Sequence, residues 1–107
     1  MKLILAIVNN DDSHAVSSAL TREGYSATKL STTGGFLMAG NTTFLVGTDE
    51  SKVEPVIEII KQHSRKRNQM APVLPAHNAG VFATMPVEVV VGGATIFVLD
   101  VEKFEKI

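Results

Sequence analysis

The chain has 107 residues, of which 45% are hydrophobic and 20% are charged, and it contains no cysteine. This length and composition predict one globular domain over residues 1–107, and the missing cysteines exclude disulfides and thiolate metal sites and fit the reducing cytoplasm. Ten basic and eleven acidic side chains give a net charge of -1, which lacks the cationic excess typical of nucleic-acid-binding proteins.

The first predicted element is a buried β-strand over residues 2–8. Its apolar run ends at Asn9 and Asn10. The run is therefore shorter than the apolar core of an export signal, and far shorter than the ~20 residues of a membrane span. We expect no export signal and no membrane partner.

A helix over residues 12–23 should follow. Gly24 can end it, because glycine is common just after a helix. Side chains that could cap its first turn are Asp11, Asp12 and Ser13. An apolar stripe for packing comes from Val16, Ala19 and Leu20.

Residues 25–33 and 41–48 are rich in Thr, Val, Phe and Leu, so we expect two neighbouring strands there. Between them lies a glycine-rich segment, residues 34–43. Its glycines let backbone N–H groups approach a ligand, Phe36 can stack on a base, and the Asn41 amide can pair with an adenine edge. We expect a nucleotide-binding loop, and the alternative is a mobile hairpin connection.

The glycine-rich segment does not match the phosphate-binding loop of nucleotide triphosphatases, because Asn41 stands in place of the lysine. It also leads into a strand, so there is no helix N-terminus for a Rossmann pyrophosphate. The absence of both motifs therefore argues against triphosphate hydrolysis and dinucleotide redox chemistry.

A second helix is predicted over residues 51–66. Ser51 and Glu54 have capping-box spacing, and Pro55 would lie in the first turn, where proline is tolerated. The buried face would comprise Val53, Val56, Ile57, Ile59 and Ile60. A basic cluster, Arg65–Arg67, is interpreted as favouring the negative C-terminal end of this helix.

Residues 67–83 have no sustained hydrophobic period, and we expect a long loop there. Residues 87–91 and 95–99 suit two strands, joined by a hairpin turn at Gly92 and Gly93. A short tail over residues 101–107 completes the chain.

This order of elements predicts an α+β fold of the ferredoxin-like class, β-α-β-β-α-β, with an additional C-terminal strand. Two helices cover one face of an antiparallel sheet. The strands are nevertheless apolar at successive positions, as in Leu3 to Val8, so both faces require burial. A symmetric homo-oligomer whose sheets meet would bury the second face.

The sequence offers no candidate catalytic or metal-binding constellation. His14, His63 and His77 have neither metal-ligand spacing nor a common face, and no nucleophile turn of the G-x-S-x-G kind occurs. We therefore expect a protein that is not an enzyme and that carries no metal or cofactor.

Several motifs together resemble the PII-like cyclic-di-AMP receptor family (PstA/DarA-like) of Gram-positive bacteria. They run through nearly the whole chain and comprise Met1–Ile4, Ala27–Leu30, Thr32–Leu37, Gly40–Phe44, Lys66–Met70, Pro86–Val89 and Gly92–Val98. The resemblance implies a homotrimer that binds the second messenger in clefts between subunits. It also implies signalling to an unknown downstream protein through loop rearrangement, without catalysis.

Matching positions imply the ligand contacts. Thr28 would contact polar groups of the ligand, and Asn41 together with the Gly47 backbone would read adenine. The other ligand-lining positions are Gly35, Phe36 and Leu37 on the phosphate and ribose side, and Gly92 and Gly93 in the neighbouring wall.

Three positions depart from the family pattern. Ser26 and Met38 stand where basic residues are common, and Lys106 replaces a usual glutamine. Each lost charge-assisted contact is worth about 1.5–3 kcal/mol. This leaves open a second hypothesis, a trimeric protein-interaction module that has lost or changed its nucleotide ligand. A small ferredoxin-like enzyme is the least favoured reading.

Overall fold

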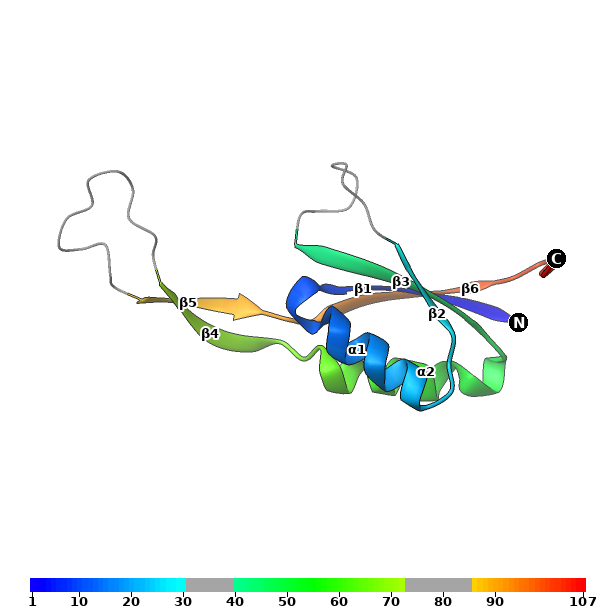
Figure 1. Cartoon of the computed structure of the whole chain (residues 1–107), viewed down its shortest axis with the longest axis horizontal. Coiled ribbons are helices and arrows are strands. Elements are labelled where there is room, and N and C mark those ends of the chain that lie inside the picture. Colours follow the sequence, from blue (N-terminus) through cyan, green and yellow to red (C-terminus); the bar gives the residue numbers. More distant parts are fainter. Residues whose placement is uncertain (31–39, 73–85) are drawn as a thin grey trace.

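The computed structural model describes residues 1–30, 40–72 and 86–107. Two helices pack on one face of a sheet, and a two-stranded ribbon extends away from them (Figure 1). The elements in chain order are β1 (Lys2–Asn9), α1 (Asn10–Arg22), β2 (Ala27–Leu30), β3 (Asn41–Thr48), the 3-10 turn η1 (Glu50–Lys52), α2 (Val53–His63), β4 (Arg67–Pro72), β5 (Pro86–Val91) and β6 (Ala94–Asp100).

The main sheet is antiparallel with strand order β2-β3-β1-β6. The predicted α+β ferredoxin-like class is confirmed, with the C-terminal strand β6 beside β1. The expected pairing of the segments on either side of the glycine-rich segment is also confirmed, since Ala27–Leu30 pairs with β3. The strand predicted over residues 25–33 is seen from Ala27 to Leu30, and residues 31–33 lie outside the described part.

The hydrophobic core lies between this sheet and the two helices. Alternate residues of β1 point into it, as a period of two requires: Ile4, Ala6 and Val8 are buried. The predicted helix stripes are confirmed for α1 at Val16, Ala19 and Leu20 and for α2 at Val53, Val56 and Ile60, and Phe44 and Val46 of β3 complete the core.

The start of α1 differs from the prediction. Its N-cap is Asn9, whose Oδ1 accepts a hydrogen bond from the backbone N–H of Asp11 at 2.8 Å. The proposed caps Asp11, Asp12 and Ser13 lie inside the first turn instead, because β1 passes into the helix without a connecting loop. Asp11 and Asp12 there face the positive end of the helix dipole, which is favourable.

The capping box predicted for α2 is wrong. Residues Glu50–Lys52 form a 3-10 turn, and the N-cap Lys52 makes no side-chain cap hydrogen bond. The helix also ends early, at His63, and the Ser64 hydroxyl donates to the Ile60 carbonyl in the last turn. The Arg65–Arg67 cluster consequently lies beyond the helix, with Arg67 at the start of β4.

The long loop predicted from residue 67 is wrong over its first part, and so is the hairpin at Gly92 and Gly93. β4 pairs with β5, whereas β6 pairs with β1, so the two glycines connect strands of different sheets. The ribbon extends away from the helices and the main sheet (Figure 1), and β4 contributes no residue to the described core, so its sequence does not need the alternation of a half-buried strand. Residues 73–85 lie outside the described part.

The face of the sheet opposite the helices carries large apolar side chains, and no helix or strand within residues 1–30, 40–72 and 86–107 covers them. The strand register places Leu5 between Leu45 and Phe97 on this face, and Leu3 beside Leu99. Phe97 is 53% exposed and Leu99 is 47% exposed. We call this surface, with Leu30 and Ile7, the outer face. The expectation that both faces are apolar is confirmed.

Gly92→Ala should destabilise the fold more than Gly24→Ala. Both glycines have positive φ, 84° and 88°, which costs an alanine about 1–2 kcal/mol. A Cβ at Gly24 would meet open space, whereas one at Gly92 would overlap the Arg65 carbonyl oxygen and approach Arg67 Nη1 to 2.7 Å. Urea unfolding measures both losses, and equal losses would contradict the packing described at the ribbon base.

Candidate functional site

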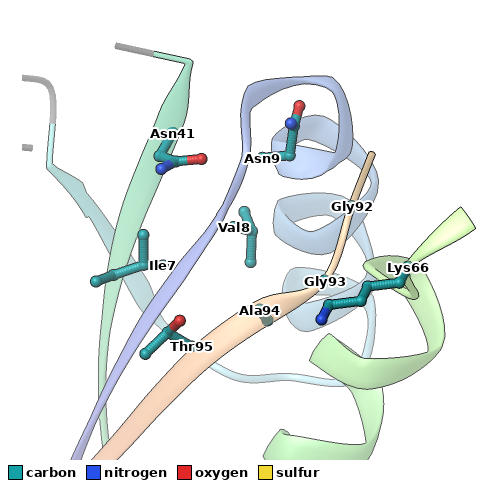
Figure 2. A pocket seen from close by; sticks show the side chains of 9 residues that line it. All are labelled: Ile7, Val8, Asn9, Asn41, Lys66, Gly92, Gly93, Ala94 and Thr95. Carbon is teal, nitrogen blue, oxygen red and sulfur yellow. The ribbon is translucent and has the colours of Figure 1, made fainter. Parts of the chain in front are cut away.

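A hollow of about 310 Å³ opens where β1 ends and β3 and β6 begin. Strand residues form its floor, and the link between β5 and β6 forms one side (Figure 2). Its lining comprises Ile7, Val8, Asn9, Asn41, Lys66, Gly92, Gly93, Ala94 and Thr95. We call it the asparagine hollow.

Two asparagines face each other across this hollow, because the register of β1 and β3 pairs Asn9 with Asn41. Asn9 is occupied as the cap of α1. Asn41 is exposed, and its amide makes no hydrogen bond to another described residue. The amide can therefore present a donor and an acceptor to a ligand, as adenine recognition requires.

The glycine wall of the hollow is held by the chain just after α2. The Gly93 N–H donates to the Ser64 carbonyl, and Gly92 packs against the Arg65 backbone. Both glycines have positive φ, which lets the chain turn from the ribbon into β6 at this point. The two glycines therefore shape this wall through their backbone conformation.

A partly buried ion pair fixes the base of the ribbon beside the hollow. Arg67 Nη2 and Nη1 donate to the two carboxylate oxygens of Asp12 at 2.8 and 3.3 Å, and Nη1 also donates to the Arg65 carbonyl at 3.1 Å. The Asp12 side chain is only 8% exposed. Hydrogen bonding to Asp12 raises the pKa of the Arg67 guanidinium. The Arg67 side chain therefore has a structural role, because it joins the start of β4 to α1.

A second space, of about 550 Å³, lies on the outer face at the other end of the sheet. Its lining comprises Met1, Leu3, Ser26, Thr28, Leu45, Gly47, Val101, Phe104, Glu105 and Lys106. We call it the tail groove, because residues of the C-terminal tail form one side.

The structure brings the expected ligand residues together in two groups. Asn41, Gly92 and Gly93 line the asparagine hollow, and Thr28 and Gly47 line the tail groove. Asn41 and Gly47 lie at opposite ends of β3, six residues or roughly 20 Å apart. One chain does not place them on the same adenine. The other expected contacts, Gly35, Phe36 and Leu37, lie outside the described residues.

Sequence reasoning missed the three other polar residues that line the hollow, namely Asn9, Lys66 and Thr95. Asn9 was read only as the end of an apolar run, and Lys66 as part of a helix end. The signal for Asn9 was its position directly before a helix, which is typical of a cap. Nothing in the local pattern distinguishes Lys66 from its basic neighbours.

Across residues 1–30, 40–72 and 86–107, no group of three His, Asp or Glu side chains is placed to hold a metal ion. Within the same ranges, neither helix has the length and apolar character needed to cross a membrane.

Comparison with known proteins places this chain in one family. The family described as "Cyclic-di-AMP receptor" matches residues 1–107. The chain is also similar to a solved structure from Pediococcus pentosaceus, described as a functionally unknown protein. The two are 42% identical, with a TM-score of 0.77, over 99% of this chain and 96% of that one.

The two facing asparagines should respond differently to alanine. Asn9→Ala removes a helix cap and should lower the free energy of unfolding by about 1 kcal/mol. Asn41→Ala should change it by less than about 0.5 kcal/mol, as is usual for exposed positions. Urea denaturation of both variants measures this difference, and a larger loss for Asn41→Ala would show that Asn41 has a structural role.

Proposed function

The chain belongs to the cyclic-di-AMP receptor family, and on this basis we propose that it binds cyclic-di-AMP in clefts between the subunits of a cytoplasmic homotrimer. Ligand binding then rearranges loops that signal to a protein partner. The observation that carries this proposal is the division of the expected contacts between two ends of one sheet. The protein then acts as a receptor, which binds the ligand without converting it.

The outer face supports assembly. Its large apolar side chains come from all four strands of the main sheet, including Leu5 and Leu45 at the centre and Phe97 at the edge. Contiguous apolar surface of this kind is normally buried against another protein surface. Copies of the same chain are the economical partner, because a symmetric assembly buries the same face on each subunit.

Assembly would also bring together the two groups of expected ligand residues, which lie far apart in one chain. An adenine bound to Asn41 lies far from Gly47 of the same subunit, yet both residues are expected to read adenine. If the asparagine hollow of one subunit faces the tail groove of the next, the two ends meet around one ligand. A cleft between subunits is then where Asn41, Thr28 and Gly47 can act together.

The chemistry of the two groups suits a cyclic dinucleotide. The Asn41 amide can pair with an adenine edge, and the Thr28 hydroxyl can donate to a polar group of the ligand. Gly47 is exposed within β3 and has no side chain, so a ligand can approach its backbone closely. Phe36 would add a stacking surface.

The alternative function is a trimeric protein-interaction module that has lost or changed its ligand. It is favoured by the uncharged residues Ser26 and Met38, at positions where charge would assist phosphate binding. The two functions differ in one simple respect. Capture of the partner protein should depend on nucleotide for a receptor and be independent of it for a module.

Calorimetric titration with cyclic-di-AMP, ATP and cyclic-di-GMP tests ligand binding directly. We expect binding of cyclic-di-AMP, with the affinity reduced roughly 5- to 100-fold in Asn41→Ala because a paired base edge is lost. Phe36→Ala should also weaken binding. The matched control is Asn68→Ala, an exposed asparagine on β4, which should bind normally. Absence of heat with all three nucleotides would contradict the receptor function.

Assembly can be tested separately by light scattering after size exclusion. Leu99→Glu places a carboxylate on the outer face and should convert trimers to monomers, because burying an unpaired charge is costly. Val90→Glu is the matched control, since Val90 is 67% exposed on the ribbon, and it should remain trimeric. Circular dichroism checks that both fold. A trimer that survives Leu99→Glu would place the interface elsewhere.

A further inference from the structure

The proposed ligand carries two phosphodiester anions, and a buried anion needs a positive charge or several hydrogen-bond donors. Ser26 lines the tail groove without a charge, and Met38 of the glycine-rich segment is also neutral. The described cations that line the two spaces are Lys66 and Lys106. One of these is therefore the natural candidate for the phosphates.

The surroundings of the two lysines differ. Lys106 shares the tail groove with an acidic residue, Glu105, whose carboxylate pairs with Lys103 at 3.3 Å. Lys66 is the single charged side chain among the nine residues that line the asparagine hollow. Among the described ion pairs, which join Lys2 to Asp100, Arg67 to Asp12 and Lys103 to Glu105, Lys66 takes no part. The positive potential of the hollow thus comes from Lys66.

The backbone holds the lysine stem in this position. The Lys66 side chain runs alongside Gly93 at the rim of the hollow (Figure 2). A Cβ on Gly93 would come within 3.0 Å of Lys66 Cγ and 3.4 Å of Cε, so the missing side chain makes room for the stem. Gly93 is itself tied to the Ser64 carbonyl. The lysine stem therefore starts from a fixed point on the β6 side of the hollow, and Asn41 lies on its β3 side (Figure 2).

Its basic neighbours do not reach the hollow. Arg67 lies behind Gly92, but its guanidinium is bonded to Asp12 and to the Arg65 carbonyl, and it is not among the lining residues. Lys61 and Arg65 line a separate space of about 410 Å³, together with Ile57 and Ile96. Of the four cations near the end of α2, Lys66 is the one that lines both this separate space and the asparagine hollow.

We propose that Lys66 binds a phosphate group of the cyclic dinucleotide in the asparagine hollow, while Asn41 binds a base beside it. This inference rests on the proposed function and deepens it. Lys66 is then a specificity residue, because it selects an anionic nucleotide over a neutral nucleoside. It also links the ligand to the ribbon, since Lys66 immediately precedes β4.

Titration of three matched variants with cyclic-di-AMP tests the proposal. Lys66→Gln should weaken binding about tenfold or more, as expected for loss of a charge-assisted contact. Lys66→Arg keeps the charge and should stay within a few-fold of wild type. Arg65→Gln removes a charge from the same cluster but outside the hollow, and it should bind normally. Lys66 is exposed, so these changes should leave the fold intact.

Salt separates a phosphate contact from a change of shape. The electrostatic screening length falls to about 3 Å at 1 M salt. The affinity of the wild type should therefore fall towards that of Lys66→Gln as the salt concentration rises. Wild-type affinity in Lys66→Gln, or an equal loss in Arg65→Gln, would overturn the role of Lys66 while leaving the receptor function standing. A wild type that binds no cyclic-di-AMP would overturn both.

Discussion

The pairing of β3 between β1 and β2 is the constraint on which the rest of the structure depends. All eight residues of β3 are in register with β1, from Asn41 opposite Asn9 to Thr48 opposite Lys2. This register sends Phe44 and Val46 into the core and Leu45 onto the outer face. It also fixes Asn41 and Gly47 at opposite ends of one strand. A slip of one residue would reverse both faces, so the core and the placement of the two ligand groups are decided together.

A second set of contacts connects the asparagine hollow to the ribbon. The Arg67–Asp12 ion pair, the close packing of Gly92 on the Arg65 backbone and the hydrogen bond from Gly93 to Ser64 all lie at the ribbon base. Asp12 belongs to the first turn of α1, and the cap of that helix, Asn9, lines the hollow. An isolated two-stranded ribbon is only marginally stable. Its orientation is therefore set at this base, next to the site where we propose that ligand binds.

Much of this fold follows from the sequence alone, for identifiable reasons. β1, β3 and both helix stripes have strong hydrophobic patterns, because each packs one face on the core. The ribbon was missed because β4 has no core face, and the turn at Gly92 and Gly93 was misassigned because positive φ suits a hairpin and a change of sheet equally well. Asn41 was predicted as a ligand contact from its chemistry, and the structure places it in the lining of the hollow. The place of Lys66 in the hollow depends on how the chain after α2 packs against Gly93, and no local sequence pattern encodes that contact.

We propose that the ligand site forms only on assembly, where the Asn41 end of one subunit acts together with the Thr28 and Gly47 end of another. A crystal structure of the protein with cyclic-di-AMP tests this most directly. We predict that each ligand contacts Asn41 of one subunit and Thr28 or the Gly47 backbone of its neighbour. A ligand whose contacts all come from a single chain would contradict the account.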